Sequence, residues 1–121
     1  MSPPEVKHDP LSDTLIICLE PGPGAVCFRL NSHILLRWDM AGGYPRGLHL
    51  MDYSRLTKPT EMGLRSVPLT GLSRMPSELR ESVIAALQRP PLDEFITLST
   101  YVPPRGKEVP IASIHVRTVA A

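Results

Sequence analysis

The sequence predicts an α+β domain in which an antiparallel sheet of about six strands, an N-terminal meander and a C-terminal hairpin, packs around one main amphipathic helix. Three observations support this fold class. Apolar and polar residues alternate with period two in both halves of the chain, only one segment has strong helical periodicity, and 14 prolines divide the 121 residues into short elements. Hydrophobic content of 42% is typical of a globular protein, so residues 12–121 are expected to form a single domain.

Residues 1–11 are predicted to form a flexible N-terminal arm, because they contain three prolines and mixed charges. They lack the apolar stretch of a secretory signal, and no later segment approaches the length of a membrane span. We therefore expect a cytoplasmic protein with no membrane partner. The net charge is only +1, and its ten arginines are spread from Arg29 to Arg117, which argues against a nucleic-acid partner.

The first two predicted strands face each other across the turn Pro21-Gly22-Pro23-Gly24. This register places Cys18 opposite Cys27. In a reducing compartment two nearby free thiols are expected, although spacing alone leaves open whether they are bonded. The same register predicts that one face of the hairpin points to the core through Leu15, Ile17, Leu19, Val26, Phe28 and Leu30.

Two further strands complete the predicted meander. Asn31-Ser32 form a tight turn into a strand over residues 34–38, and a strand over residues 48–53 follows the glycine-rich loop 41–47. Prolines and glycines then interrupt the chain as far as residue 73, with a short strand expected over residues 64–70.

One segment has the periodicity of an amphipathic helix. It begins at Pro76, Glu78 favours its amino end, and Pro90-Pro91 end it. The closing hairpin is expected from residues 95–102 and 111–119. The apolar stripe of the helix, which is expected to pack on the sheet, consists of Leu79, Val83, Ala86 and Leu87.

The densest group of polar residues surrounds the third strand. His33, Arg37 and Asp39 are expected on one of its faces, and His49 lies on the next strand. An imidazole titrates near neutral pH, a carboxylate can orient it or act as a base, and a guanidinium can hold an enolate oxygen. These four residues are the candidate catalytic groups. The alternative is an ordinary solvent face, which any half-buried sheet produces.

Trp38 is expected to anchor the core. The functional alternative is that aromatic residues and methionines line an apolar cavity between sheet and helix. No motif for nucleotide, zinc or thiol redox chemistry is present, so no cofactor is expected. The three histidines His33, His49 and His115 lack metal-ligand spacing, so no metal site is expected either. The candidate ligand-binding residues are Phe28, Trp38, Tyr44, Met51, Tyr53 and Phe95.

Two functions agree with these features. The leading prediction is a small cytosolic protein that binds a small hydrophobic metabolite in a cavity between sheet and helix. Whether it also acts on this metabolite, as a cofactor-independent isomerase or cyclase, is left open by the sequence. The alternative is a non-enzymatic protein-interaction module that acts through an exposed strand edge or a homodimer interface. A closed cavity walled by His33, Arg37 or Asp39 would favour the first, and a filled core with an exposed apolar patch over residues 56–72 would favour the second.

Overall fold

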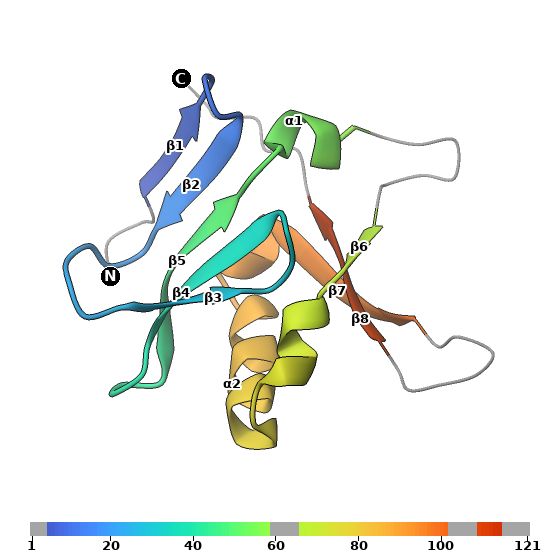
Figure 1. Cartoon of the computed structure of the whole chain (residues 1–121). Helices are drawn as coiled ribbons and strands as arrows, with labels where there is room; N and C mark the ends of the chain where they lie inside the picture. The colour runs from blue at the N-terminus through green and yellow to red at the C-terminus, as the bar shows by residue number, and fades with distance from the viewer. Residues whose placement is uncertain (1–4, 59–65, 102–108, 115–121) are drawn as a thin grey trace.

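The computed structural model describes residues 5–58, 66–101 and 109–114 (Figure 1). It has an α+β fold with two antiparallel sheets, one of five strands and one of three, and one main helix. The predicted fold class is therefore confirmed at this level. The strands are divided between two sheets, whereas the sequence predicts a single sheet of about six.

The larger sheet has a Greek-key arrangement. Its strands lie in the order β1 (Glu5–Asp9), β2 (Thr14–Cys18), β5 (Tyr44–Leu50), β4 (Ile34–Asp39) and β3 (Val26–Arg29). The strands β3, β4 and β5 form a meander, while β2 lies beside β5 and reaches β3 only by crossing the ends of two strands.

The predicted hairpin between β2 and β3 is wrong. Ile17 of β2 is paired with Leu48, and Phe28 of β3 is paired with Leu36. The two prolines of the connecting segment have no N–H to donate to a ladder, and the N–H groups of Leu19 and Glu20 both donate to the Arg46 carbonyl instead. The segment is therefore a crossover connection rather than a tight turn.

The same topology separates the two cysteines. Cys18 and Cys27 lie in one row across the sheet, with β5 and β4 between them. Three strand spacings correspond to about 14 Å, whereas the Cα atoms of a disulfide lie within about 7 Å of each other. Both cysteines are free thiols.

Two segments differ in type from their predictions. Glu5–Asp9, predicted to belong to a flexible arm, form the edge strand β1, and Val6 packs against the core from it. The strand predicted over residues 48–53 begins earlier, as β5, and is followed by the short helix α1 (Tyr53–Leu56).

The Asn31-Ser32 turn is confirmed: the Asn31 side-chain oxygen accepts hydrogen bonds from the N–H groups of His33 and Ile34 at 2.7 and 2.9 Å.

The smaller sheet contains β6 (Ser66–Pro68), β8 (Val109–Ile114) and β7 (Ile96–Tyr101), in that order. The closing hairpin is confirmed, because β7 and β8 pair antiparallel with Ile96 opposite Ile114. The part of this hairpin predicted over residues 115–119 lies outside the described residues.

The predicted helix is confirmed as α2 (Ser77–Leu87), between the short 3-10 helices η1 (Thr70–Arg74) and η2 (Leu92–Glu94). It contacts β5 and β7, one strand of each sheet, so it joins the two sheets around a common core. Trp38 and Phe95, the largest fully buried side chains, fill that core. No helix in the described part of the chain is long and apolar enough to cross a membrane.

Candidate functional site

His33 is positioned by the start of α1. Its Nδ1 atom lies 2.9 Å from a carboxylate oxygen of Asp52, which is ion-pair distance when the imidazole is protonated, although the angle is not that of a regular hydrogen bond. Asp52 precedes α1 with a left-handed backbone, at φ 56°. His33 therefore pairs with this aspartate, whereas the sequence analysis grouped it with Asp39.

Arg37 and His49 do lie close together, on the face of the sheet that points away from the core. Arg37 is opposite Gly47 and extends over it, and its guanidinium donates to the Gly22 carbonyl at 3.0 Å. His49 is half-buried beside Leu35. Burial first, and then the positive charge of Arg37, lower the pKa of His49 below its usual 6.5.

Asp39 has a structural task at the end of β4. One of its carboxylate oxygens accepts a hydrogen bond from the Gly42 N–H at 2.7 Å, which closes the β4–β5 turn, and the other lies 3.8 Å from Arg46. The four predicted catalytic residues are therefore divided among three places, and only Arg37 and His49 lie together.

The predicted ligand-binding residues are also divided. Trp38 and Phe95 are core residues, each at most 1% exposed, and Phe28 and Tyr53 pack against the same core from half-buried positions. Met51 is half-buried as well. Only Tyr44, which is 39% exposed, reaches the surface of the protein at a cavity.

That cavity is an open groove of about 550 Å³ between α2 and the β4–β5 turn. The turn contributes Gly43, Tyr44 and Pro45 on one side. The other side is a single stripe along α2 and its end, made of Glu78, Glu81, Ser82, Ala85, Ala86, Arg89 and Pro90. The amphipathic pattern of the helix predicts a polar side but does not show which element lies opposite it.

Tyr44 forms the wall of this groove, and two carboxylates hold its phenol group. The hydrogen bond to Glu20 is the largest cause that raises the pKa of Tyr44, to about 12, followed by partial desolvation and the charges of Asp39 and Glu20. Glu20 lies at the beginning of the crossover segment, so this contact ties the groove to the crossover between β2 and β3.

Arg46 holds that crossover in place and was missed by the sequence analysis. It is only 6% exposed and donates to the carbonyl oxygens of Pro21 and Pro23, at 2.9 Å each. Gly22 and Gly24 have positive φ, and a Cβ on either would touch the guanidinium at about 3.5 Å. The sequence gives little signal for this contact, because Arg46 lies in a segment with the composition of a loop.

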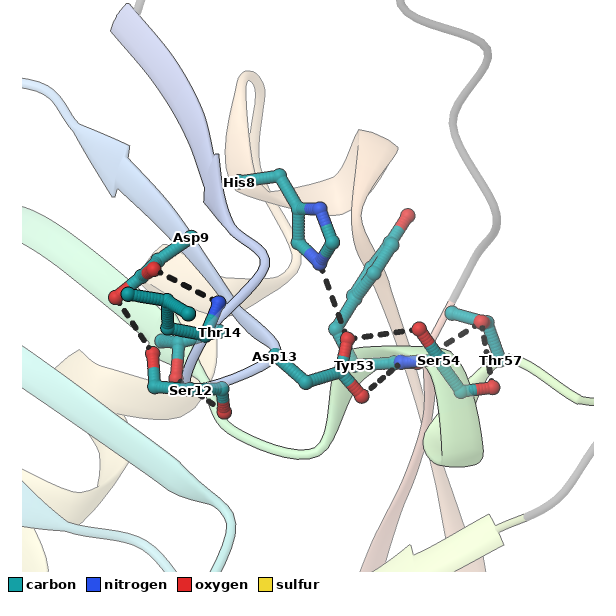
Figure 2. Close-up of polar contacts among 9 residues, drawn as sticks. His8, Asp9, Ser12, Asp13, Thr14, Tyr53, Ser54 and Thr57 are labelled. Carbon is teal, nitrogen blue, oxygen red and sulfur yellow. Dashed lines mark hydrogen bonds and ion pairs between the residues drawn. The ribbon is translucent and has the colours of Figure 1, made fainter.

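A further polar cluster joins the β1–β2 turn to α1, and Figure 2 shows its central residue, Asp13, between His8 and Ser54. One Asp13 carboxylate oxygen accepts from His8 at 3.0 Å and from the Ser54 hydroxyl at 2.7 Å, and the other accepts from the Ser54 N–H. These bonds, with that of Ser54 first, lower the pKa of Asp13. In a nucleophilic triad the histidine contacts the serine, whereas here the aspartate lies between them, so the cluster fastens α1 and does not activate the hydroxyl.

No group of three or more histidine, cysteine, aspartate or glutamate side chains in the described ranges is arranged to bind a metal ion. Compared with known proteins, the chain matches no family model, no curated protein and no solved structure.

Proposed function

We propose that this protein is a non-enzymatic protein-interaction module that binds another polypeptide chain in the groove between α2 and the β4–β5 turn. The observation that carries the proposal is the contrast between a filled interior, where Trp38 and Phe95 occupy the space between sheets and helix, and a groove open along one side. The apolar patch expected over residues 56–72 is not exposed in the described part of that range, because Leu56, Leu69 and Leu72 are buried in the core. Small-molecule sites bury most of their ligand in a largely apolar pocket. An open groove with a mixed lining suits a polypeptide surface better.

The residues around the groove support this function. Met40 and Tyr44, both on the β4–β5 hairpin, are 54% and 39% exposed. Methionine, tyrosine and arginine are enriched in protein interfaces, and Arg89 adds a guanidinium at the end of α2. Within the described ranges, no ion pair involves Glu78, Glu81 or Arg89, so their charges are available to a partner.

Photocrosslinking in the cells from which the protein comes tests this function. The photoreactive residue p-benzoylphenylalanine replaces Glu81, which is exposed at the edge of the groove. The matched control carries it at Gln88, which is exposed beside α2 but is not part of the groove lining. Mass spectrometry of the crosslinked product identifies the captured chain and the peptide that is attached.

We expect one defined polypeptide to be attached at position 81 and not at position 88. Its binding is then reproduced with the two purified proteins. If position 81 captures no polypeptide, or captures the same mixture as position 88, the proposed function is wrong.

A second candidate function, the isomerase or cyclase acting on a hydrophobic metabolite, has one supporting observation. His49, with its lowered pKa, is neutral at physiological pH, and Arg37 beside it can hold an anionic oxygen. Native mass spectrometry of the protein from its own source tests this function. A retained small molecule that is absent from the Arg37→Ala variant supports it, and a protein free of small molecules in both forms contradicts it.

A further inference from the structure

We infer that the occupant of the groove is a second copy of this chain, bound through antiparallel packing of its α2 against α2 across a two-fold axis. This inference rests on the proposed function, because it names the partner of the same groove. Its evidence is the order of charges and side-chain sizes along one stripe of the helix.

The stripe has the spacing of a helix–helix seam. Glu78, Ser82, Ala85 and Arg89 all line the groove, and they follow one another at intervals of four, three and four residues. The first three residues belong to α2 and follow the 3.5-residue repeat by which two helices keep one face in contact. Arg89 continues the same spacing from the turn just after the helix, which ends at Leu87. The core-facing residues Val83 and Leu87 occupy a different side of α2, so a second helix leaves the packing of the core unchanged.

The charges along the seam are complementary to those of an antiparallel copy. The stripe is negative at the amino end of α2, at Glu78 and Glu81, and positive at Arg89. A two-fold axis between Ser82 and Ala85 brings Glu78 of each protomer to Arg89 of the other, which forms the same ion pair twice. A parallel arrangement would place like charges together, so the charge order selects the antiparallel pair.

The middle of the seam allows the two helices to approach closely. Under the same two-fold axis Ser82 of one protomer meets Ala85 of the other, and both side chains are small. The Ser82 hydroxyl already donates to the Glu78 carbonyl of its own helix at 3.1 Å, so it can be buried without a new partner. Small side chains at the contact favour the short end of the usual 8–10 Å distance between helix axes.

The β4–β5 turn supplies the side walls. Tyr44 and Pro45 line the groove opposite α2, so a helix that enters it contacts α2 on one side and an aromatic ring on the other. The carboxylates of Glu20 and Asp39, which raise the pKa of the Tyr44 phenol, lie beside this ring. The helical part of the seam, from Glu78 to the end of α2 at Leu87, extends about 14 Å at 1.5 Å per residue, and Arg89 follows in the turn after the helix.

Sedimentation velocity of the full chain, from micromolar to submillimolar concentration, tests the inference. We expect a concentration-dependent dimer. Glu78→Arg and Arg89→Glu each replace both ion pairs by like-charge contacts, and each is expected to raise the dissociation constant by about tenfold or more. The double variant Glu78→Arg/Arg89→Glu re-forms both pairs with reversed polarity and is expected to restore the dimer.

The double variant also controls for folding. The Glu78→Arg change places a cation in the first turn, where it opposes the helix dipole in the single and in the double variant alike. A dimer restored by the second change therefore cannot be explained by a more stable helix. Circular dichroism verifies that each variant is folded, and Glu5→Arg on the distant strand β1 is the matched charge reversal, expected to have no effect.

A chain that is monomeric at every concentration overturns this inference, as does a dimer that ignores both single changes or is not restored by the double change. Photocrosslinking at position 81 separates this failure from that of the proposed function. If position 81 captures a different protein, the homodimer is contradicted and the proposed interaction function is supported. If it captures no polypeptide, the homodimer and the proposed function are both contradicted.

Discussion

At the scale of single residues, Arg46 holds the crossover segment of the larger sheet. Two carbonyl oxygens of the crossover depend on its guanidinium, and Asp39 is the nearest carboxylate, at 3.8 Å. A lysine cannot replace its planar pair of donors. Because this cation is almost completely buried, its removal leaves carbonyls of a packed segment without a donor.

We therefore expect Arg46→Met, which keeps the apolar stem, to lower the free energy of unfolding by about 2 to 3 kcal/mol. Urea denaturation measures the loss. The matched control is Arg37→Met, which removes one bond to the same crossover, at Gly22, from a half-buried side chain. Its cost is expected at about 1 kcal/mol. Equal losses in the two variants would show that the buried Arg46 holds the crossover no more strongly than the half-buried Arg37.

Tyr44 gives a second prediction at this scale. Its phenol is expected to ionise near pH 12, because the carboxylates of Glu20 and Asp39 stabilise the neutral form. Absorbance at alkaline pH, taken as the difference between the wild type and Tyr44→Phe, measures this ionisation. In Glu20→Gln the midpoint should move toward the ordinary value of 10. A midpoint that does not change in Glu20→Gln would show that Glu20 does not raise the pKa of Tyr44.

At the scale of elements, local patterns predicted which face a strand buries but not which strand lies beside it. Leu15, Ile17 and Leu30 are buried as predicted, because alternation decides the face whatever the partner is. Val26, from the same predicted core face, is 42% exposed because β3 is an edge strand. The pairing of β2 with β5 depends on contacts some 30 residues apart, and no local pattern encodes it.

The candidate site was predictable to a similar extent. Tyr44 was among the predicted ligand-binding residues, and it does line the groove. The polar stripe of α2 was visible as amphipathicity, but its neighbour across the groove depends on the tertiary fold. Trp38 is buried, as expected of a core anchor, and Phe95 is buried as well. Both were also candidates for lining a cavity, because sequence alone does not distinguish an aromatic residue that lines a pocket from one that fills it.

One close backbone contact gives the prediction at the scale of elements. Gly71, in η1, donates its N–H to the Leu30 carbonyl at 2.7 Å, and an added Cβ would overlap the backbone around Arg29 and Leu30. Backbone cannot yield as a flexible side chain can, so Gly71→Ala should displace η1 and lower the free energy of unfolding by about 3 kcal/mol.

Gly43→Ala is the control for this substitution. Its Cβ would meet no atom within 4 Å, but its backbone is left-handed at φ 70°. Gly43→Ala is expected to lower the free energy of unfolding by only about 1 kcal/mol, which is the cost of holding an alanine in a left-handed backbone conformation. Thermal unfolding compares the two variants. A smaller loss at Gly71 than at Gly43 would show that η1 shifts freely over the end of β3.

At the scale of the whole molecule, the ionisable groups make stability depend on pH in a defined direction. The folded-state pKa of His49 lies below 6.5, the value of an exposed histidine, so between these two values the unfolded chain binds more protons than the folded one. The free energy of unfolding therefore increases with pH in this interval, and the contribution of His49 is complete above it. As the pH falls below 6.5, this contribution is progressively lost. Asp9 and Asp13 act lower on the scale, because their lowered pKa values mean that the stability they add above 3.8 is lost in acid.

Urea denaturation at about pH 5.5 and about pH 7.5 is carried out on the wild type and on His49→Gln. The comparison measures how much His49 contributes to the pH dependence of the free energy of unfolding. The wild type is expected to lose more stability between these two pH values than the variant, because only the wild type carries the imidazole whose protonation the fold disfavours. All other ionisable groups are the same in both proteins, so their contributions cancel in the comparison. Arg37→Met should reduce the difference as well, since the charge of Arg37 is the second cause of the lowered pKa. If the wild type and His49→Gln lose stability equally on acidification, the fold does not disfavour protonation of His49, and the lowered pKa cited for the second candidate function has no support.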